Sequence, residues 1–247
     1  MKMQLPIAIT PASVNINEYT YLIYGRPKIG KTTFASKFPN ALFIATEHGH
    51  KFVSVYRVNP TSWEDIKTLV GRLINEEHSY KTVVVDTADN LFIMCAKYIC
   101  RGLGIDHQSD AEFGKAYDRI KLELMAFTNA LTQHGLGVVF ISHTEDREIN
   151  EKITKADDEG HHVSYIEKVK KTDSTLSGTA KKVIHGLCDM IFYCYGDDEQ
   201  KRWLRTKETT TIVAGDRSGM LPEVMPLDFD VFKQHLTEGS GEGGNSD

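Results

Sequence analysis

Eight residues near the start of the chain have types and a spacing that suit the binding of phosphate. They are Gly25, Arg26, Pro27, Lys28, Ile29, Gly30, Lys31 and Thr32, and Thr33 follows them. The glycines let the backbone turn so that successive N–H groups point inward and surround phosphate oxygens. The lysine can then reach the outer phosphates, and the first threonine hydroxyl can bind Mg²⁺. We therefore predict that residues 25–33 bind a nucleotide.

The segments on either side of this loop have the structure that such a site needs. Residues 19–24 (YTYLIY) are aromatic and β-branched, which predicts a buried strand, and residues 32–38 can begin a helix. The N-terminus of that helix would add a positive dipole end to the N–H groups of the loop. A glycine-rich strand-to-helix turn with an exposed lysine is the alternative, and this context makes it the weaker interpretation.

Two acidic residues follow later strands and could serve the same site. Asp86 ends the apolar run 81–86 (KTVVVD), where a carboxylate can hold Mg²⁺ through water. A buried strand can also end in an aspartate that caps a helix. Glu47 comes just after the apolar run 41–45 (ALFIA), and parallel neighbouring strands would point its carboxylate toward the terminal phosphate. There it can act as a general base that polarises water, with an exposed loop glutamate as the alternative.

Strands and helices alternate along most of the chain. A buried strand is predicted at 137–142 (GVVFIS), and helices are predicted after Ser62 and near residues 88–101, 112–134, 178–185 and 229–236. One side of the helix at 112–134 is apolar, with Phe113, Ala116, Ile120, Leu124, Phe127 and Leu131. Strands are also predicted at 187–195 and 202–206, and one or two short strands with mobile connections within 144–177. This alternation predicts an α/β fold with a mainly parallel central sheet covered on both faces.

Composition indicates a single main domain inside a reducing compartment. The chain has 247 residues, and its apolar runs are no longer than a strand, so we expect no membrane contact and a cytoplasmic location. Four cysteines lie singly in apolar segments, which predicts buried thiols rather than disulfides or zinc ligands. They are Cys95, Cys100, Cys188 and Cys194.

The negative charge of the chain is concentrated at its C-terminal end. The formal net charge is −5, from 29 basic and 34 acidic residues, and residues 237–247 (TEGSGEGGNSD) contain three of the acids and no basic residue. We therefore divide the chain into an extended arm at 1–18, a main domain at 19–236 and a disordered acidic tail at 237–247. Because the main domain is nearly neutral, any contact with a nucleic-acid backbone must come from local basic patches.

Several of these segments together resemble the ATPase core of RecA-type recombinases. They are the loop at 25–32, Thr46-Glu47-His48-Gly49, Asp86 in VVVDTADN, and Ser142-His143 in VVFISH. More closely, nearly the whole chain resembles the phage-encoded, RecA-like proteins that anneal single strands with ATP, the Sak-type annealing ATPases. That likeness extends to residues 49–52 (GHKF), 176–184 (LSGTAKKVI), 205–207 (RTK) and 214–228 (AGDRSGMLPEVMPLD). It implies a three-layer RecA-type P-loop fold, ATP and Mg²⁺ as cofactors, and a bacterial host cytoplasm.

The resemblance also implies roles for individual residues. The catalytic base would be Glu47, and the polar residue that senses the γ-phosphate would be His143 or Ser142. Many recombinases have glutamine at the sensing position, so a histidine that only caps its strand is the alternative. ATP would lie between the subunits of a homo-oligomer, with Lys207 or Arg217 of the neighbour touching the γ-phosphate. Exposed side chains are the alternative for both, as is a local carboxylate contact for Arg217.

The resemblance implies that two segments contact single-stranded DNA, residues 102–110 and 144–177. Residues 145–175 have six basic and nine acidic residues, but the stretch 161–171 (HHVSYIEKVKK) combines three lysines with an aromatic residue. Such a strip suits phosphate neutralisation and base stacking, although a solvated charged hairpin is the alternative. The expected DNA contacts are Lys168, Lys170, Lys171, Lys181 and Lys182.

The function that these features favour is ATP hydrolysis coupled to assembly on single-stranded DNA, for recombination or strand annealing. A single-strand-binding protein is among the partners that the likeness suggests. One alternative is an ATPase that remodels or loads a protein partner, and another is a nucleotide switch with little turnover. The adenine pocket is undefined, with Tyr24 and Tyr56 as candidates.

Overall fold

The computed structural model describes residues 5, 7–9, 15–47, 52–156 and 162–238. Within them, one sheet of nine strands has the order β11-β9-β8-β1-β5-β4-β2-β3, and β10 pairs with β8. The strands are β1 Thr20–Gly25, β2 Ala41–Ala45, β3 Tyr56–Val58, β4 Thr82–Asp86, β5 Gly137–Ser142, β8 Met190–Gly196, β9 Arg202–Arg205, β10 Gly215–Asp216 and β11 Val224–Pro226. The six strands from β8 to β3 in this order run parallel, whereas β9, β10 and β11 pair antiparallel. The predicted mainly parallel sheet is therefore confirmed.

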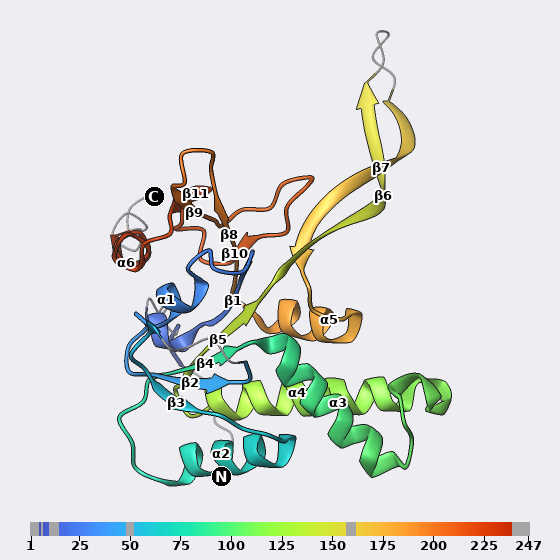
Figure 1. Ribbon diagram of the computed structural model, residues 1–247. Coiled ribbons are helices and arrows are strands. Elements are labelled where there is room, and N and C mark those ends of the chain that lie inside the picture. The colour runs from blue at the N-terminus through green and yellow to red at the C-terminus, as the bar shows by residue number, and fades with distance from the viewer. Residues whose placement is uncertain (1–4, 6, 10–14, 48–51, 157–161, 239–247) are drawn as a thin grey trace.

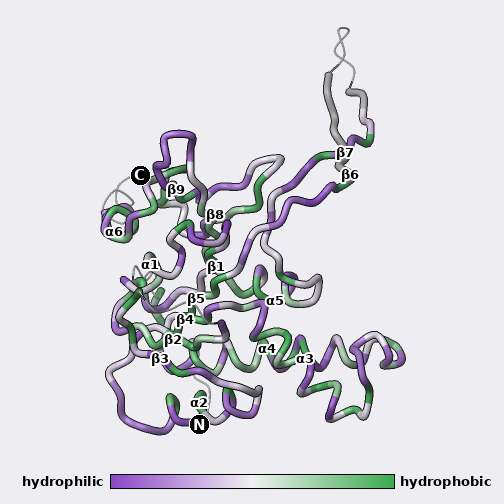
Figure 2. The backbone as a smooth tube through the Cα atoms, viewed as in Figure 1, coloured by the Kyte–Doolittle hydropathy of each residue, from purple (hydrophilic) through white to green (hydrophobic). Residues whose placement is uncertain are grey.

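Helices cover both faces of the sheet and make the domain three layers thick (Figure 1). The helices are α1 Lys31–Ala35, α2 Trp63–Asn75, α3 Ala88–Leu103, α4 Lys115–Thr132, α5 Gly178–Leu187 and α6 Phe229–Glu238. One core cluster joins the sheet to α2, α3, α4 and α5, and a second joins the opposite face to α1 and α6. Figure 2 shows hydrophobic residues gathered where these helices meet the sheet. Since both faces of the central strands are buried, those strands are continuous apolar runs in the sequence.

Strand β1 shows how this sandwich is built around the phosphate loop. All six of its residues are buried. Leu22 belongs to the core cluster under α2–α5, whereas Tyr21 and Ile23 belong to the cluster under α1 and α6. The loop that follows β1 therefore starts from a strand held by neighbours on both edges and by side chains on both faces.

The prediction that the strands within 144–177 are short is wrong, and the connection between them at 157–161 lies outside the described residues. Residues Thr144–Ala156 form β6 and His162–Ser174 form β7, and the two strands pair antiparallel along their whole length. This ribbon projects away from the body of the domain (Figure 1). Ile149 lies opposite Val169, and Glu148 lies opposite Lys170. Cross-strand pairs of β-branched residues and of opposite charges stabilise such a ribbon without a core of its own.

Two details of the predicted helices also differ from the structure. The helix after the phosphate loop ends at Ala35 rather than near residue 38, since the Lys37 and Phe38 N–H groups donate to carbonyl oxygens three residues back instead of four. Pro39 disfavours helical backbone at Phe38 and so prevents the helix from resuming. Phe113 does not belong to the apolar face of α4, because it is fully exposed and lies before the helix begins. Its φ of 53° and the φ of 70° at Gly114 turn the chain into α4 from another direction.

The two predicted ends of the chain fall mostly outside the described residues. In the arm at 1–18, Ile16–Glu18 form a 3-10 helix and the Ile16 side chain packs into the core under α1 and α6. In the tail at 237–247, the first two residues complete α6, and residues 239–247 lie outside the described part.

Candidate nucleotide site

The site forms where the carboxyl ends of parallel strands meet at one edge of the sheet. The phosphate loop follows β1, Asp86 ends β4, Glu47 follows β2 and His143 follows β5. These strands are parallel neighbours, so their ends lie together. A cavity of about 450 Å³ opens there. It is lined by Pro27, Lys28, Gly30, Lys31, Thr32, Thr33, Glu47, Phe52, Val53, Asp86, His143 and Arg202.

The glycines of the loop are required by its backbone and its close packing. Gly30 has a φ of 114°, a conformation that side chains with a Cβ atom rarely adopt. A Cβ atom on Gly25 would lie 2.3 Å from the carbonyl oxygen of Cys194 on β8. The loop can therefore leave β1 only with glycine at its first position, as the phosphate-loop pattern requires.

Lys31 lies at the centre of the loop with its side chain buried. Its Nζ donates hydrogen bonds to the carbonyl oxygens of Gly25 at 2.8 Å and Arg26 at 2.9 Å. Burial lowers the pKa of the Lys31 amine, against the opposing effects of Cys194, Asp86 and other acids. A buried ammonium group next to a cavity is placed to bind an anion, because phosphate oxygens supply the charge that the carbonyl groups lack.

Thr32 and Asp86 meet as the sequence predicts. The Thr32 hydroxyl donates a hydrogen bond to Asp86 Oδ2 at 2.8 Å. Asp86 is 6% exposed and faces the cavity that Thr32 also lines. A hydroxyl and a carboxylate are oxygen ligands of the kind that Mg²⁺ prefers when the rest of its coordination comes from phosphate and water. The residues present therefore fit Mg²⁺ held next to a nucleotide.

Among the described residues, the Glu47 carboxylate has three polar neighbours. Oε1 accepts a hydrogen bond from the Thr87 hydroxyl at 2.8 Å and one from Asn90 Nδ2 at 3.4 Å. His143 Nε2 lies 3.6 Å from the same oxygen, while His143 Nδ1 is buried without a hydrogen-bond partner in the described part of the chain. Glu47 and His143, predicted from separate segments, are thus in contact. Thr87 and Asn90 were missed, although both belong to the same VVVDTADN segment as Asp86.

Polar contacts connect this site to the base of the β6–β7 ribbon. The hydroxyls of Ser142 and Thr175 each donate a hydrogen bond to the Asp89 carboxylate, at 2.8 Å and 2.7 Å respectively. The Thr175 N–H donates to the carbonyl oxygen of His143 at 3.1 Å. Since β6 begins directly after His143 and β7 ends directly before Thr175, both ends of the ribbon are fastened beside Glu47.

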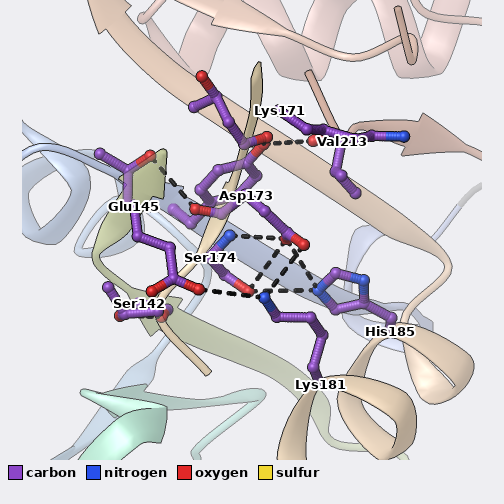
Figure 3. Close-up of polar contacts among 12 residues, drawn as sticks. Ser142, Glu145, Lys171, Asp173, Ser174, Lys181, His185 and Val213 are labelled. Atoms are coloured by element: carbon purple, nitrogen blue, oxygen red, sulfur yellow. Dashed lines mark hydrogen bonds and ion pairs between the residues drawn. The ribbon is translucent and has the colours of Figure 1, made fainter. Parts of the chain in front are cut away.

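Three of the five lysines expected to contact DNA form ion pairs with described residues. Lys181 Nζ lies 3.1 Å from the buried Asp173 carboxylate and 3.4 Å from Glu145. Lys171 pairs with Glu208 at 2.8 Å, and the more exposed Lys170 pairs with Asp146 at 3.0 Å. Figure 3 shows Lys181 pointing between Asp173 and Glu145 at the base of the ribbon.

The remaining two lysines and the second DNA segment have different surroundings. Lys168 and Lys182 are exposed, and neither has an ion pair among the residues whose side chains are described. Residues 102–110 lie at the far end of α3 from Asp86, about 24 Å along a helix of 16 residues. DNA contact at any of these positions stays a prediction.

His185 completes the polar cluster at the ribbon base. Its Nε2 lies 3.3 Å from the Ser174 hydroxyl and 3.8 Å from Asp173 (Figure 3). Burial lowers the pKa of His185, although the Asp173 carboxylate opposes this shift. A neutral histidine next to a carboxylate that already has two cationic partners, Lys181 and Arg147, fits a structural anchor.

Lys207 and Arg217 do not line the cavity of their own chain. Lys207 Nζ pairs with the buried Asp216 carboxylate at 3.0 Å. Arg217 Nη1 pairs with Asp189 at 3.2 Å, which is the local carboxylate contact that the sequence left open. Their predicted contact with the nucleotide of a neighbouring subunit stays a prediction.

Neither tyrosine named for the adenine pocket lines the cavity. Tyr24 is fully buried in β1, and its hydroxyl donates to the carbonyl oxygens of Val213 and Thr172. Tyr56 lies on β3 at the edge of the sheet, where it is 62% exposed. A buried Tyr24 cannot stack on a base, so the side of the cavity that receives the nucleoside must be found from other residues.

The fold and this cavity define a P-loop nucleotide-binding domain of the α/β class, as the sequence predicts. A family model described as an AAA domain matches residues 17–218, and the chain belongs to this family of AAA domains. The match includes the phosphate loop, Glu47, Asp86 and His143, and the family indicates an ATPase. No curated protein matches the chain. Among the described residues, no helix is long and apolar enough to cross a membrane.

Proposed function

We propose that the protein binds Mg²⁺-ATP in this cavity and hydrolyses it to ADP and phosphate. The observation that carries the proposal is the meeting of three groups at one sheet edge. They are the buried amine of Lys31, the Thr32–Asp86 pair and the Glu47 carboxylate with its polar neighbours. Together they supply a cation for phosphate, oxygen ligands for the metal and a base for water.

Each residue has a distinct part in this mechanism. Residues 25–33 bind the phosphates, and Thr32 and Asp86 hold Mg²⁺, which when bound offsets the negative charge of the phosphates. Glu47 accepts the proton of the attacking water. Thr87 and Asn90 hold the Glu47 carboxylate in place through Oε1, and the half-exposed side chain can release its proton to solvent.

The test compares nucleotide binding and phosphate release in Lys31→Ala and in a matched control, Lys37→Ala. Lys37 is an exposed cation on the same segment that does not line the cavity. We expect Lys31→Ala to lose binding or turnover and Lys37→Ala to retain both. Near-normal hydrolysis by a folded Lys31→Ala protein would refute the proposal.

We further propose that this ATPase assembles as a homo-oligomer on single-stranded DNA and serves recombination or strand annealing. The resemblance to annealing ATPases and the fastening of the ribbon beside Glu47 support this proposal. The side chains of Tyr165, Ile166 and Lys168 on the ribbon are exposed, Ile166 at 74%. Exposed aromatic, apolar and cationic side chains suit contact with bases and phosphates. A single-strand-binding protein is a further proposed partner.

The ATPase rate with and without single-stranded DNA tests this second step. Stimulation by the polymer, together with a larger particle size in its presence, is the expected result. If DNA neither binds in the presence of ATP nor changes the rate, the exposed apolar side chains of the ribbon favour the other candidate, an ATPase that remodels or loads a protein partner.

A further inference from the structure

Arg202 reaches the phosphate loop from a part of the sheet that the loop pattern does not include. It is the first residue of β9, where it lies opposite Gly196 at the end of β8. Its carbonyl oxygen also accepts a hydrogen bond from the Leu227 N–H at 2.9 Å. Because β8 runs parallel to β1 and β9 runs back, the first residue of β9 lies at the same sheet edge as the loop.

The Arg202 guanidinium lies against the loop itself. A Cβ atom on Gly30 would be 3.1 Å from Arg202 Nη1, and one on Gly196 would be 3.5 Å from Ile29 Cδ1. Arg202 lines the same cavity as Lys31, Thr32 and Thr33. The end of the β8–β9 pair thus lies close to the loop at two positions, Gly30 and Gly196, and Arg202 lines the cavity there.

The charge of Arg202 is not neutralised by a carboxylate in the described part of the chain. Lys207, Arg217 and Lys171 all have such partners, whereas Arg202 is exposed and no acidic residue lines this cavity on the β9 side. A guanidinium offers several N–H donors in one plane and binds phosphate oxygens in pairs. An arginine held this way next to a phosphate loop is placed to bind phosphate.

Sheet order decides which end of the nucleotide Arg202 meets. Glu47, Asp86 and His143 come from β2, β4 and β5 on one side of β1, whereas Arg202 comes from β9 on the other side. The phosphate that is cleaved must lie beside the base and the metal ligands. The α-phosphate and the nucleoside therefore extend toward β9.

We propose that Arg202 binds the α-phosphate end of the nucleotide, as a binding residue separate from the hydrolytic groups. This inference rests on the proposed ATP site. It predicts that ATP and ADP lose affinity by the same factor when Arg202 is removed, because both carry the α-phosphate. A charge-assisted hydrogen bond to phosphate corresponds to a loss of about 10- to 100-fold in affinity.

The experiment is calorimetric titration with ADP and with a slowly hydrolysed ATP analogue, each with Mg²⁺. The variants are Arg202→Ala, Arg202→Gln, which keeps a polar stem if the alanine variant folds poorly, and Arg202→Lys. The control is Lys201→Ala, because Lys201 is the adjacent cation, pairs with Glu199 at 2.6 Å and does not line the cavity. Circular dichroism without nucleotide checks the fold of each variant.

An equal loss for both nucleotides, partly restored in Arg202→Lys and absent in the control, is the expected result. Unchanged affinity in Arg202→Ala and Arg202→Gln, while Lys31→Ala fails to bind, would overturn the role of Arg202 and leave the ATP site intact. A loss confined to the ATP analogue would also overturn it, because Arg202 would then contact the γ-phosphate. If the wild-type protein binds neither nucleotide, the proposed function itself fails.

Discussion

The Glu47 carboxylate combines two properties that a general base for water requires. Its Oε1 is fixed by the Thr87 hydroxyl at 2.8 Å, yet the side chain is 37% exposed and can reach water. Fixing one oxygen orients the carboxylate, and no described residue donates a hydrogen bond to Oε2, the oxygen that would accept a proton. His143 at 3.6 Å from Oε1 adds a group whose contact with the carboxylate is strongest when the ring carries a proton.

Replacing Glu47 with glutamine should separate binding from hydrolysis. We expect Glu47→Gln to keep its affinity for ATP and to hydrolyse it about 10²- to 10⁴-fold more slowly, because the amide accepts no proton. Single-turnover phosphate release with excess enzyme measures the effect. Glu64→Gln is the control, since Glu64 is half-exposed and pairs with Arg101 on α3. Hydrolysis within a few-fold of wild type would make Glu47 an ordinary loop residue.

The contribution of Asp216 to the stability of the fold depends on pH. Burial raises the pKa of its carboxyl, but hydrogen bonds from Ser218, from Lys207 and from the Leu221 N–H outweigh burial and leave the pKa below the usual 3.8. The folded state therefore binds this proton more weakly than the unfolded state. The stabilisation is present at pH values above the unfolded pKa and is lost as the pH falls through the folded pKa.

Asp216→Asn should remove this pH-dependent part of the stability. At neutral pH we expect a loss of about 1–3 kcal/mol in the free energy of unfolding, because the hydrogen bonds to the buried carboxylate weaken while the Lys207 side chain, 33% exposed, can still meet water. The difference in the free energy of unfolding between variant and wild type should become smaller as the pH falls below 3.8. Urea denaturation followed across this pH range measures it, and a gap that stays constant would argue against an ionised Asp216.

The site residues divide into those that the sequence can reveal and those that it cannot. Asp86 and Glu47 follow apolar runs, and the ends of parallel strands must meet, so residue type and order are sufficient to place them near the loop. Arg202 begins a strand whose position depends on the pairing of β8 with β1 and of β9 with β8. Pairings between distant segments leave no local pattern, and KRWLRTK is an unremarkable charged strand.

At the scale of elements, the β6–β7 ribbon depends on a buried charged cluster for its attachment. Asp173 is 1% exposed and has Arg147, Lys181 and His185 as partners. A buried carboxylate costs several kcal/mol in desolvation unless cations and hydrogen bonds compensate. The length of the ribbon was not predictable, because its stability comes from cross-strand pairs in a polar segment without apolar alternation throughout. The strands of the core were predictable because burial on both faces makes them uniformly apolar.

The lysines of β7 and α5 that are expected to contact DNA should therefore separate into two kinds of variant. Removing the exposed Lys168 or Lys182 should lower the dependence of log K on log salt for single-stranded DNA by about 0.7 for each lost phosphate contact. Removing Lys171 or Lys181, which are held in ion pairs, should lower the melting temperature and leave the salt slope unchanged. Fluorescence anisotropy over a salt series and thermal denaturation measure the two effects. Equal slopes in all four variants and wild type would place the DNA path elsewhere.

At the scale of the whole molecule, the described cations that line the cavity lie on its phosphate-loop and β9 sides. Lys28 and Lys31 line it from the loop and Arg202 lines it from β9, whereas the described residues that follow or end β2, β4 and β5 there are Glu47, Asp86 and His143. The Lys207 side chain is 33% exposed although it is paired with Asp216, so a second partner can reach it. This arrangement suits completion of the site by a neighbouring copy, which is the proposed homo-oligomer.

Mixing two inactive variants tests whether a cation acts between subunits. Glu47→Gln supplies Lys207 and Arg217 but no base, whereas the triple variant Lys207→Ala/Asp216→Asn/Arg217→Ala supplies the base but neither cation. Asp216→Asn is included because it removes the buried carboxylate that Lys207→Ala alone would leave unpaired. Asp216→Asn by itself keeps both cations and is the control for lost stability.

Each variant alone should hydrolyse ATP poorly, since a cation from a neighbour can contribute about 10³- to 10⁵-fold in rate. In an equal mixture about one interface in four joins an intact base to an intact cation, so the mixture should recover about a quarter of the wild-type rate. Size-exclusion chromatography with two differently tagged chains establishes that the variants assemble together. Recovery would be expected only if the base and the cation come from different copies. If the chains co-assemble and the rate stays at the level of the separate variants, Lys207 and Arg217 act within their own subunit or serve only their ion pairs with Asp216 and Asp189.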